Sequence, residues 1–220
     1  MLDFNALRET MVKSQILPNK VSNPLLIKAL STVPRELFVK KEYENLAYAD
    51  GILPLDHNRS IMPPLVFANL VEALSIQPDE NVLDVAAGYG YSSAILGFLS
   101  KLVISLESDL DRSKIAKRLL EELNIFNVKS VSNPLNKGWL KAAPYDVIIL
   151  EGVVHEVPSK LFEQLKDGGR LGALIAYNSY ETPRATIFHK TNKTLTRKIV
   201  FEAEAPMIKE LAPVKTTFVL

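Results

Sequence analysis

The amino-acid sequence predicts an α/β fold: a doubly wound, mostly parallel sheet with N-terminal helices and an antiparallel C-terminal edge. Between residues 81 and 176, short apolar runs that suit strands alternate with stretches of helical periodicity, which is typical of a parallel sheet covered on both faces. After residue 176 the alternation stops. Three stretches, 185–189, 197–202 and 213–220, read as strands without intervening helices, and they predict the antiparallel edge.

Length and composition bound the class of protein. The chain has 220 residues, of which 47% are hydrophobic and 23% charged, as is typical of a globular α/β enzyme. We expect a single domain over residues 1–220. It comprises an N-terminal helical and loop region (1–75), an α/β core (76–176) and C-terminal strands (177–220).

Composition also argues against several partners and sites. A net charge of +1 gives no basic surface for nucleic acid, and no apolar run approaches the roughly 18 residues of a membrane span. The chain has no cysteine, which excludes disulfides and thiolate zinc sites, and His57, His155 and His189 lack metal-ligand spacing. The charged N-terminus lacks the apolar stretch of a secretory signal, so we expect a cytoplasmic protein. The sequence leaves the oligomeric state open.

Three helices are expected before the core. Ser22 or Asn23 can cap the second one, because Pro24 suits the first helical position. Residues 46–64 contain Gly51 and three prolines and read as mostly irregular. The expected helices cover residues 3–16, 24–32 and 65–74.

The core then alternates strands and helices. The expected strands cover residues 81–85, 102–106, 128–131, 147–150 and 170–176, and the expected helices cover residues 91–99, 109–123 and 158–165. A glycine turn at residues 167–169 precedes the last strand. The charged residues of helix 109–123, Arg112 among them, are expected to form a solvated face.

The first central strand leads into a glycine turn and a helix start, NVLDVAAGYGY. Such a unit is typical of nucleotide sites, because the backbone at Gly88 and Gly90 can approach a ligand closely. In a dinucleotide fingerprint the third glycine would fall at the bulky Tyr91. The residues instead fit Asp-x-Gly-x-Gly-x-Gly, with Asp84 first and Ala86 replacing the first glycine. This is similar to motif I of methyltransferases that use S-adenosylmethionine (SAM); the alternative is an ordinary strand-to-helix turn.

Two further acids follow strands of the same sheet. Ligands bind at the carboxyl ends of strands in open α/β sheets. Glu107 follows the second strand, where a carboxylate can accept hydrogen bonds from both ribose hydroxyls of an adenosine; the alternative is a surface acid. Glu151 follows the strand at 147–150 and either faces the sulfonium and the methyl acceptor or is a loop acid.

A longer set of matches, over about residues 8–176, resembles the protein-L-isoaspartate O-methyltransferases. The matching stretches are VPRELFV (33–39), AYAD (47–50), LPL (53–55), VLD (82–84), GYGY (88–91), Gly138, APYD (143–146) and QLKDGGRL (164–171). The resemblance implies a Rossmann-like SAM-methyltransferase fold and methyl transfer from SAM to the carboxylate of isoaspartyl residues in damaged proteins and peptides, which starts their repair through a succinimide. A carboxylate is already ionised at neutral pH, so the protein mainly aligns the reactants and excludes water.

The chain departs from that family at two places. The family's substrate loop reads Thr-Ile-Ser-x-Pro, whereas here Ser60 is followed by Ile-Met62-Pro-Pro, so a hydroxyl beside the acceptor becomes a thioether. Arg59 could clamp the acceptor carboxylate or be a surface residue. The family has Gly-Asp-Gly near the adenine, whereas this chain has Asn133-Pro-Leu, so Asn133 or main-chain groups are expected to contact the adenine instead. The resemblance thus implies catalytic residues Arg59, Ser60 and Met62 and SAM-binding residues Asp84, Ala86, Gly88, Gly90, Tyr91, Glu107, Asn133 and Glu151.

Three functions follow from these observations. The leading hypothesis is an isoaspartyl carboxyl methyltransferase. The alternatives are a non-catalytic SAM-binding paralogue and a methyltransferase for an unrelated small molecule. We expect that the missing hydroxyl at Met62 lowers isoaspartyl methylation without abolishing SAM binding.

Overall fold

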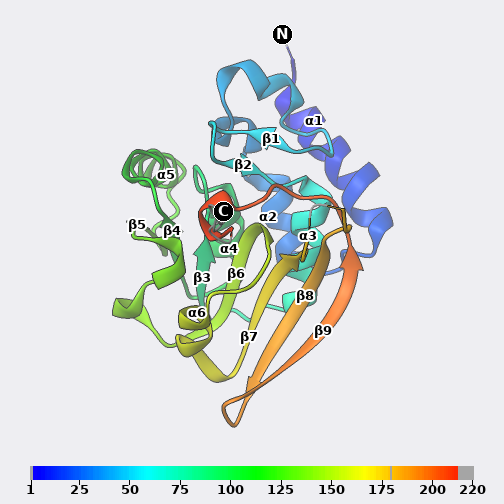
Figure 1. Ribbon diagram of the computed structural model, residues 1–220. Helices are drawn as coiled ribbons and strands as arrows, with labels where there is room; N and C mark the ends of the chain where they lie inside the picture. Colours follow the sequence, from blue (N-terminus) through cyan, green and yellow to red (C-terminus); the bar gives the residue numbers. More distant parts are fainter. Residues whose placement is uncertain (1, 179, 213–220) are drawn as a thin grey trace, which may run out of the picture.

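The computed structural model describes residues 2–178 and 180–212 and confirms the α/β fold (Figure 1). Within these residues, one seven-stranded sheet has the order β5-β4-β3-β6-β7-β8-β9. Its strands are β3 (Asn81–Val85), β4 (Leu102–Glu107), β5 (Val128–Ser132), β6 (Tyr145–Val154), β7 (Leu165–Ile175), β8 (Arg184–Thr191) and β9 (Thr194–Glu202). Strands β3 to β7 are parallel, and β8 and β9 form the antiparallel edge.

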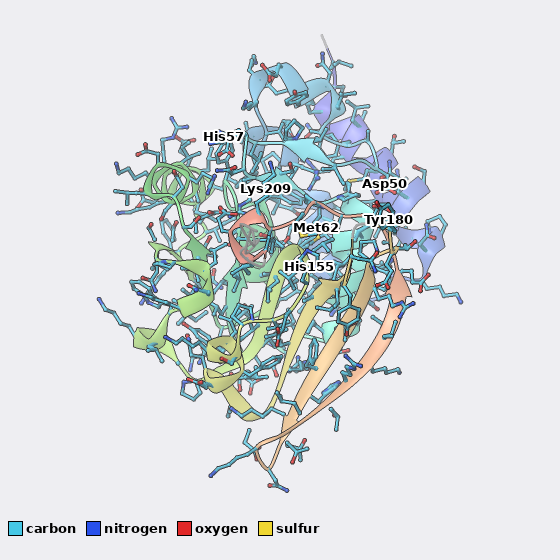
Figure 2. The ribbon with its side chains drawn as sticks, in the orientation of Figure 1. Asp50, His57, Met62, His155, Tyr180 and Lys209 are labelled. Atoms are coloured by element: carbon cyan, nitrogen blue, oxygen red, sulfur yellow. The ribbon has the colours of Figure 1, made fainter. Side chains whose placement is uncertain are left out.

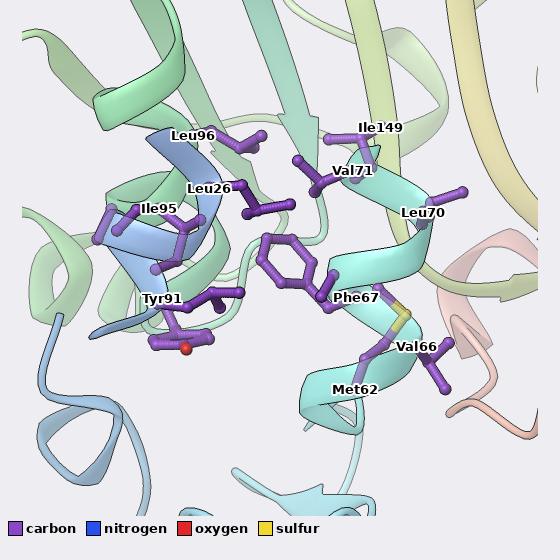
Figure 3. Close-up of a cluster of buried hydrophobic side chains, with 14 of the residues drawn as sticks. Leu26, Met62, Val66, Phe67, Leu70, Val71, Tyr91, Ile95, Leu96 and Ile149 are labelled. Atoms are coloured by element: carbon purple, nitrogen blue, oxygen red, sulfur yellow. The ribbon is translucent and has the colours of Figure 1, made fainter. Parts of the chain in front are cut away.

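Helices cover the two faces of the sheet unequally. One face carries α1 (Phe4–Met11), α2 (Pro24–Thr32), α3 (Pro64–Leu74), α4 (Tyr91–Leu99) and α5 (Leu110–Glu122). Figure 3 shows Leu26 of α2, Phe67 of α3 and Ile95 of α4 packed together in one buried apolar cluster. The other face is covered by the five-residue α6 (Ser159–Glu163) and by 3-10 turns. Across the described part of the chain, every helix is too short or too polar to span a membrane.

The start of α2 resolves which residue caps it. The side chain of Asn23 accepts hydrogen bonds from the main-chain nitrogens of Leu25 and Leu26 at 2.9 and 3.3 Å, as an N-cap does. The Ser22 hydroxyl instead donates to Glu72 at 2.7 Å. Pro24 therefore occupies the first helical position, as the sequence predicts.

Some predicted boundaries are wrong. The predicted turn at residues 167–169 lies inside β7, which begins at Leu165 and contains an irregularity in its register. The predicted irregular region contains two short strands, β1 (Leu53–Pro54) and β2 (Ser60–Ile61), which pair with each other. The predicted strand at 213–220 lies outside the described residues.

The antiparallel edge closes with a tight hairpin. Asn192 and Lys193, which join β8 to β9, both have left-handed backbones with φ of 50° and 65°. This is the conformation of a two-residue type I′ turn, whose twist matches that of the strands it joins.

After β9 the chain returns across the sheet to β6 (Figure 1). The main-chain nitrogen of Val153 donates to Pro206 at 2.8 Å, and that of Ile208 donates to Val153 at 2.9 Å. Gly152 permits this close passage, since a Cβ atom there would lie 2.4 Å from the Pro206 carbonyl oxygen. The return ends in a 3-10 turn, Lys209–Leu211, beside the carboxyl ends of the central strands.

Candidate active site

Three buried acids meet at the carboxyl edge of the sheet. Asp84 is in β3, Glu107 ends β4 and Glu151 is in β6, and these strands are neighbours in the parallel sheet. The three residues are 0%, 1% and 7% exposed. The surface-acid alternative for Glu107 and the loop-acid alternative for Glu151 are therefore wrong.

Asp84 and Glu151 form a buried carboxyl pair. The hydroxyls of Ser92 and Ser93 donate to Oδ2 of Asp84 at 2.7 and 2.5 Å. Within the described residues, Oδ1 of Asp84 and Oε1 of Glu151 are buried without a hydrogen-bond donor. Such oxygens suit a cationic ligand, because an unpartnered buried carboxylate is costly.

Burial also changes the titration of this pair. Loss of hydration raises the pKa of Asp84 to about 7, against the effect of its serine donors. Loss of hydration and the neighbouring charge of Asp84 raise the pKa of Glu151 well above its usual range. Because two neighbouring buried carboxylates cannot both be ionised at low cost, we infer that Asp84 and Glu151 share one proton.

The glycine turn adopts left-handed backbone conformations next to the acids. Ala86, Gly88 and Gly90 have φ of 69°, 62° and 95°. A Cβ atom at Gly88 would lie 2.6 Å from Cδ1 of Leu55, so the side chain of Leu55 fills the space directly over the turn. The close approach that the sequence predicts at Gly88 is thus made by Leu55 of the β1–β2 loop.

Glu107 is held by two buried arginines. Oε1 accepts from Nε of Arg59 at 2.7 Å and from the main-chain nitrogen of Gly88 at 2.8 Å, and Oε2 accepts from Nε of Arg112 at 3.0 Å. Arg59 is 3% exposed and Arg112 is 6% exposed. The surface alternative for Arg59 and the solvated position predicted for Arg112 are both wrong, because each guanidinium points inward to a carboxylate.

Arg35 also lies at the site, although it was not among the site residues predicted from the sequence. Its Nε and Nη2 atoms donate to the main-chain oxygens of Ala47 and Met62, each at 2.7 Å. Its guanidinium lies over the ring of Tyr91, 4.6 Å from the centroid. The fully buried Arg35 therefore links Met62 to Tyr91 at the start of α4. Its position in the VPRELFV stretch, which matches the family, could have identified it from the sequence.

Met62 and Ser60 differ in burial. Met62 is 1% exposed, and its thioether packs with Val66 and Phe67 of α3 (Figure 3). Ser60 is half-buried in β2. Both residues border a small cavity that also reaches Glu151.

Asn133 lies where β5 ends beside Glu107. Its main-chain nitrogen donates to the Glu107 carbonyl at 2.9 Å, and its side-chain amide donates to the Gly138 carbonyl at 2.8 Å. The amide oxygen thus remains for a ligand, and an adenine contact stays a prediction. Trp139 follows in the same turn and is half-buried.

The carboxylates of the site fit SAM, although the available space does not. Unpartnered carboxylate oxygens suit its sulfonium and ammonium charges, and Glu107 at the second strand end suits a ribose. The cavity beside the glycine turn measures about 10 Å³, which is room for one water molecule. Ligands of this size occupy pockets of roughly 300 Å³ or more. SAM therefore needs more space than this cavity offers.

The chain matches known proteins over most of its length. The family model "Protein-L-isoaspartate(D-aspartate) O-methyltransferase (PCMT)" matches residues 6–203. The protein-L-isoaspartate O-methyltransferase of Syntrophus aciditrophicus (strain SB) is 36% identical over 172 residues, which are 78% of this chain and 79% of that protein.

Two solved structures have the same fold. One protein-L-isoaspartate O-methyltransferase matches 90% of this chain with a TM-score of 0.80 and 29% identity, and this chain spans 64% of its length, less than two thirds. A Plasmodium falciparum structure in complex with S-adenosyl-L-homocysteine matches 96% of this chain and 100% of its own, with a TM-score of 0.77 and 19% identity. From the family match and its sequence relatives, the chain belongs to the protein-L-isoaspartate(D-aspartate) O-methyltransferase family.

Proposed function

We propose that this enzyme transfers a methyl group from SAM to the free carboxylate of L-isoaspartyl residues in damaged proteins and peptides. The observation that carries the proposal is the convergence of Asp84, Glu107 and Glu151 at one sheet edge, in a chain of the PCMT family. Three buried acids on adjacent parallel strands match the charge and the hydroxyl groups of SAM.

The reaction asks for alignment rather than strong acid–base catalysis. When bound, SAM supplies a methyl group on positively charged sulfur: an acceptor carboxylate oxygen forms the new C–O bond while the S–C bond breaks, and its electron pair stays on sulfur. The acceptor, with a pKa of roughly 4, is ionised at neutral pH and needs no strong base. The chain's task is to hold the acceptor in line and to exclude water.

Each part of the site has a separate role in this proposal. Asp84 and Glu151 balance the positive charge on the methionine part of SAM, and Glu107 accepts hydrogen bonds from the ribose hydroxyls. The turn at Ala86, Gly88, Gly90 and Tyr91 supports the cofactor, and Asn133 lies at the adenine. Arg59, Ser60 and Met62 form the acceptor side, while Arg35 positions their loop by its hydrogen bond to Met62.

We also propose that residues 1–220 act as one domain in the cytoplasm. One apolar cluster contains residues of the N-terminal helices, the α/β core and β8, from Met11 to Ile187, which supports a single cooperative unit. The absence of cysteine suits a reducing compartment.

Methyl-ester formation tests the proposal directly. The protein is incubated with labelled SAM and with paired peptides that contain either isoaspartate or aspartate at one position. We expect labelled esters on the isoaspartyl peptide alone. Equal labelling of both peptides would contradict isoaspartyl recognition.

One observation favours a second candidate, a SAM-binding paralogue without isoaspartyl activity. Met62 offers no hydrogen-bonding group to an acceptor carboxylate, and its side chain is part of the apolar core. SAM binding by calorimetry together with the absence of esters on either peptide would establish this second function.

A further inference from the structure

We propose that Arg59 is an internal competitor of the cofactor: its guanidinium occupies the ribose carboxylate, Glu107, until the loop that carries it moves away. This inference rests on the proposed cofactor site. It adds an affinity-determining residue that acts against binding, and it predicts that loss of this residue tightens the complex.

The carboxylate of Glu107 is saturated in the observed arrangement. Both side chains of the Arg59–Glu107 pair are 2% exposed, with contacts of 2.7 Å to Oε1 and 3.3 Å to Oε2. Gly88 donates to Oε1, while Ser108 and Arg112 each donate to Oε2 at 3.0 Å. Five donors leave no room for ribose hydroxyls, so at least one donor must leave before a ribose binds.

Arg59 is the donor best placed to leave. Gly88 and Ser108 donate through the main chain, and Arg112 belongs to the first turn of α5, whereas Arg59 lies in the loop between β1 and β2. The same loop places Leu55 over the glycine turn. A single displacement of the loop would therefore free both the ribose carboxylate and the turn.

The C-terminal turn holds this loop in place from outside. Oε1 of Glu210 accepts from Nη2 of Arg59 at 3.0 Å and from Nη2 of Arg112 at 3.3 Å. Lys209 lies beside His57 (Figure 2), and its Nζ donates to the His57 carbonyl at 2.8 Å. We call the contacts of Arg59 with Glu107 and Glu210 the latch.

A closed latch lowers the apparent affinity for SAM. When only a fraction of the molecules is open, the dissociation constant rises in inverse proportion to that fraction. A variant that weakens the latch without removing Glu107 should therefore bind more tightly. A residue that contacts the cofactor would have the opposite effect.

The test is SAM and S-adenosylhomocysteine binding to the full chain by calorimetry, with thermal unfolding of the free protein. Arg59→Gln should lower the melting temperature and lower the dissociation constant about tenfold. Glu210→Gln weakens the contacts of Glu210 with Arg59, Arg112 and Ser108, leaves the Arg59–Glu107 pair intact and should lower the dissociation constant about threefold. The control is Arg184→Gln, which breaks the exposed Arg184–Glu202 pair on the β8–β9 edge and should leave affinity unchanged.

Two results would overturn the latch. Weaker binding by Arg59→Gln would place Arg59 in contact with the cofactor, and unchanged binding would make the pair purely structural. If Arg59→Gln does not fold, Glu210→Gln decides, because that side chain is 27% exposed at the rim. Binding by the wild-type chain separates this failure from failure of the cofactor site: absence of SAM binding would overturn the cofactor site, whereas wild-type binding that is not tightened in Arg59→Gln or Glu210→Gln would overturn the latch alone.

Discussion

Asp84 and Glu151 are 67 residues apart in the sequence and nonetheless form one buried carboxyl pair across the neighbouring strands β3 and β6. Each has a side-chain oxygen without a donor among the residues that the structure describes. The pair can lose its proton when a cation arrives, and this links stability, pH and ligand binding.

The pH dependence of stability should reveal the shared proton. Burial raises the pKa of Asp84 to about 7 and raises that of Glu151, so the folded protein holds protons that the unfolded chain releases. The stabilising contribution is therefore complete below about pH 4 and is lost as the pH rises towards 7, at up to about 1.4 kcal/mol per pH unit for each proton. Urea unfolding at pH 5 and pH 8 measures this loss.

Glu151→Gln provides the comparison for that measurement. An amide donates to Asp84 without titrating, so the fall in unfolding free energy between pH 5 and pH 8 should become smaller. Glu163→Gln on the exposed side of α6 is the matched control and should keep the wild-type dependence. An equal fall in wild type and Glu151→Gln would contradict the shared proton.

The contact between Gly88 and Leu55 predicts a difference between two glycines. Gly88 and Gly168 have φ of 62° and 82°, but a Cβ atom would meet Leu55 at 2.6 Å in the first case and nothing within 4 Å in the second. Both alanine variants carry the left-handed backbone cost of about 1–2 kcal/mol. Gly88→Ala should lose roughly 1 kcal/mol or more beyond Gly168→Ala in urea unfolding; equal losses would show that Leu55 yields freely.

Met62→Ser should have opposite effects on stability and on activity. Its buried thioether packs in the apolar core, so truncation should cost about 2–4 kcal/mol in chemical unfolding, whereas Met62→Leu should cost less than about 1.5 kcal/mol. A restored hydroxyl beside the acceptor should raise the initial rate of isoaspartyl methylation at saturating SAM about ten- to two-hundredfold. A slower rate in a folded, SAM-binding Met62→Ser protein would remove Met62 from the acceptor site.

Arg35→Lys should separate positioning of the substrate loop from cofactor binding. The guanidinium spans the carbonyls of Ala47 and Met62, and a single ammonium cannot serve both with the same geometry. One buried carbonyl without a donor should cost about 1–3 kcal/mol of stability. We expect a higher KM for the isoaspartyl peptide with SAM affinity retained, and reduced SAM affinity alone would contradict the positioning role.

Local patterns predicted most of the fold and the acids of the site. The strand ends at Asp84, Glu107 and Glu151 follow from apolar periodicity, and the order of parallel strands brings them to one edge. The Asn23 cap with Pro24 and the glycine turn are also local signals. Such features depend on a few adjacent residues, and the sequence displays them directly.

The arginines could not be placed from local patterns. Arg112 lies on a helix whose Lys114, Lys117 and Arg118 side chains are more than 60% exposed, and helical periodicity does not tell which cation points inward. Arg59 meets a carboxylate 48 residues away, so its burial depends on tertiary contacts. The clue for Arg112 was its position five residues after Glu107.

The segment that returns from β9 to Val153 of β6 connects the edge of the sheet to the latch, so local opening of one affects the other. If the β8–β9 hairpin detaches, the hydrogen bonds between Val153 and residues Pro206 and Ile208 still tie the segment before Glu210 to β6. The amides of Val153 and Ile208 should then report one opening free energy in hydrogen exchange. Protection of these two amides thus measures how strongly the segment after β9 keeps Glu210, and with it Arg59, in the closed latch.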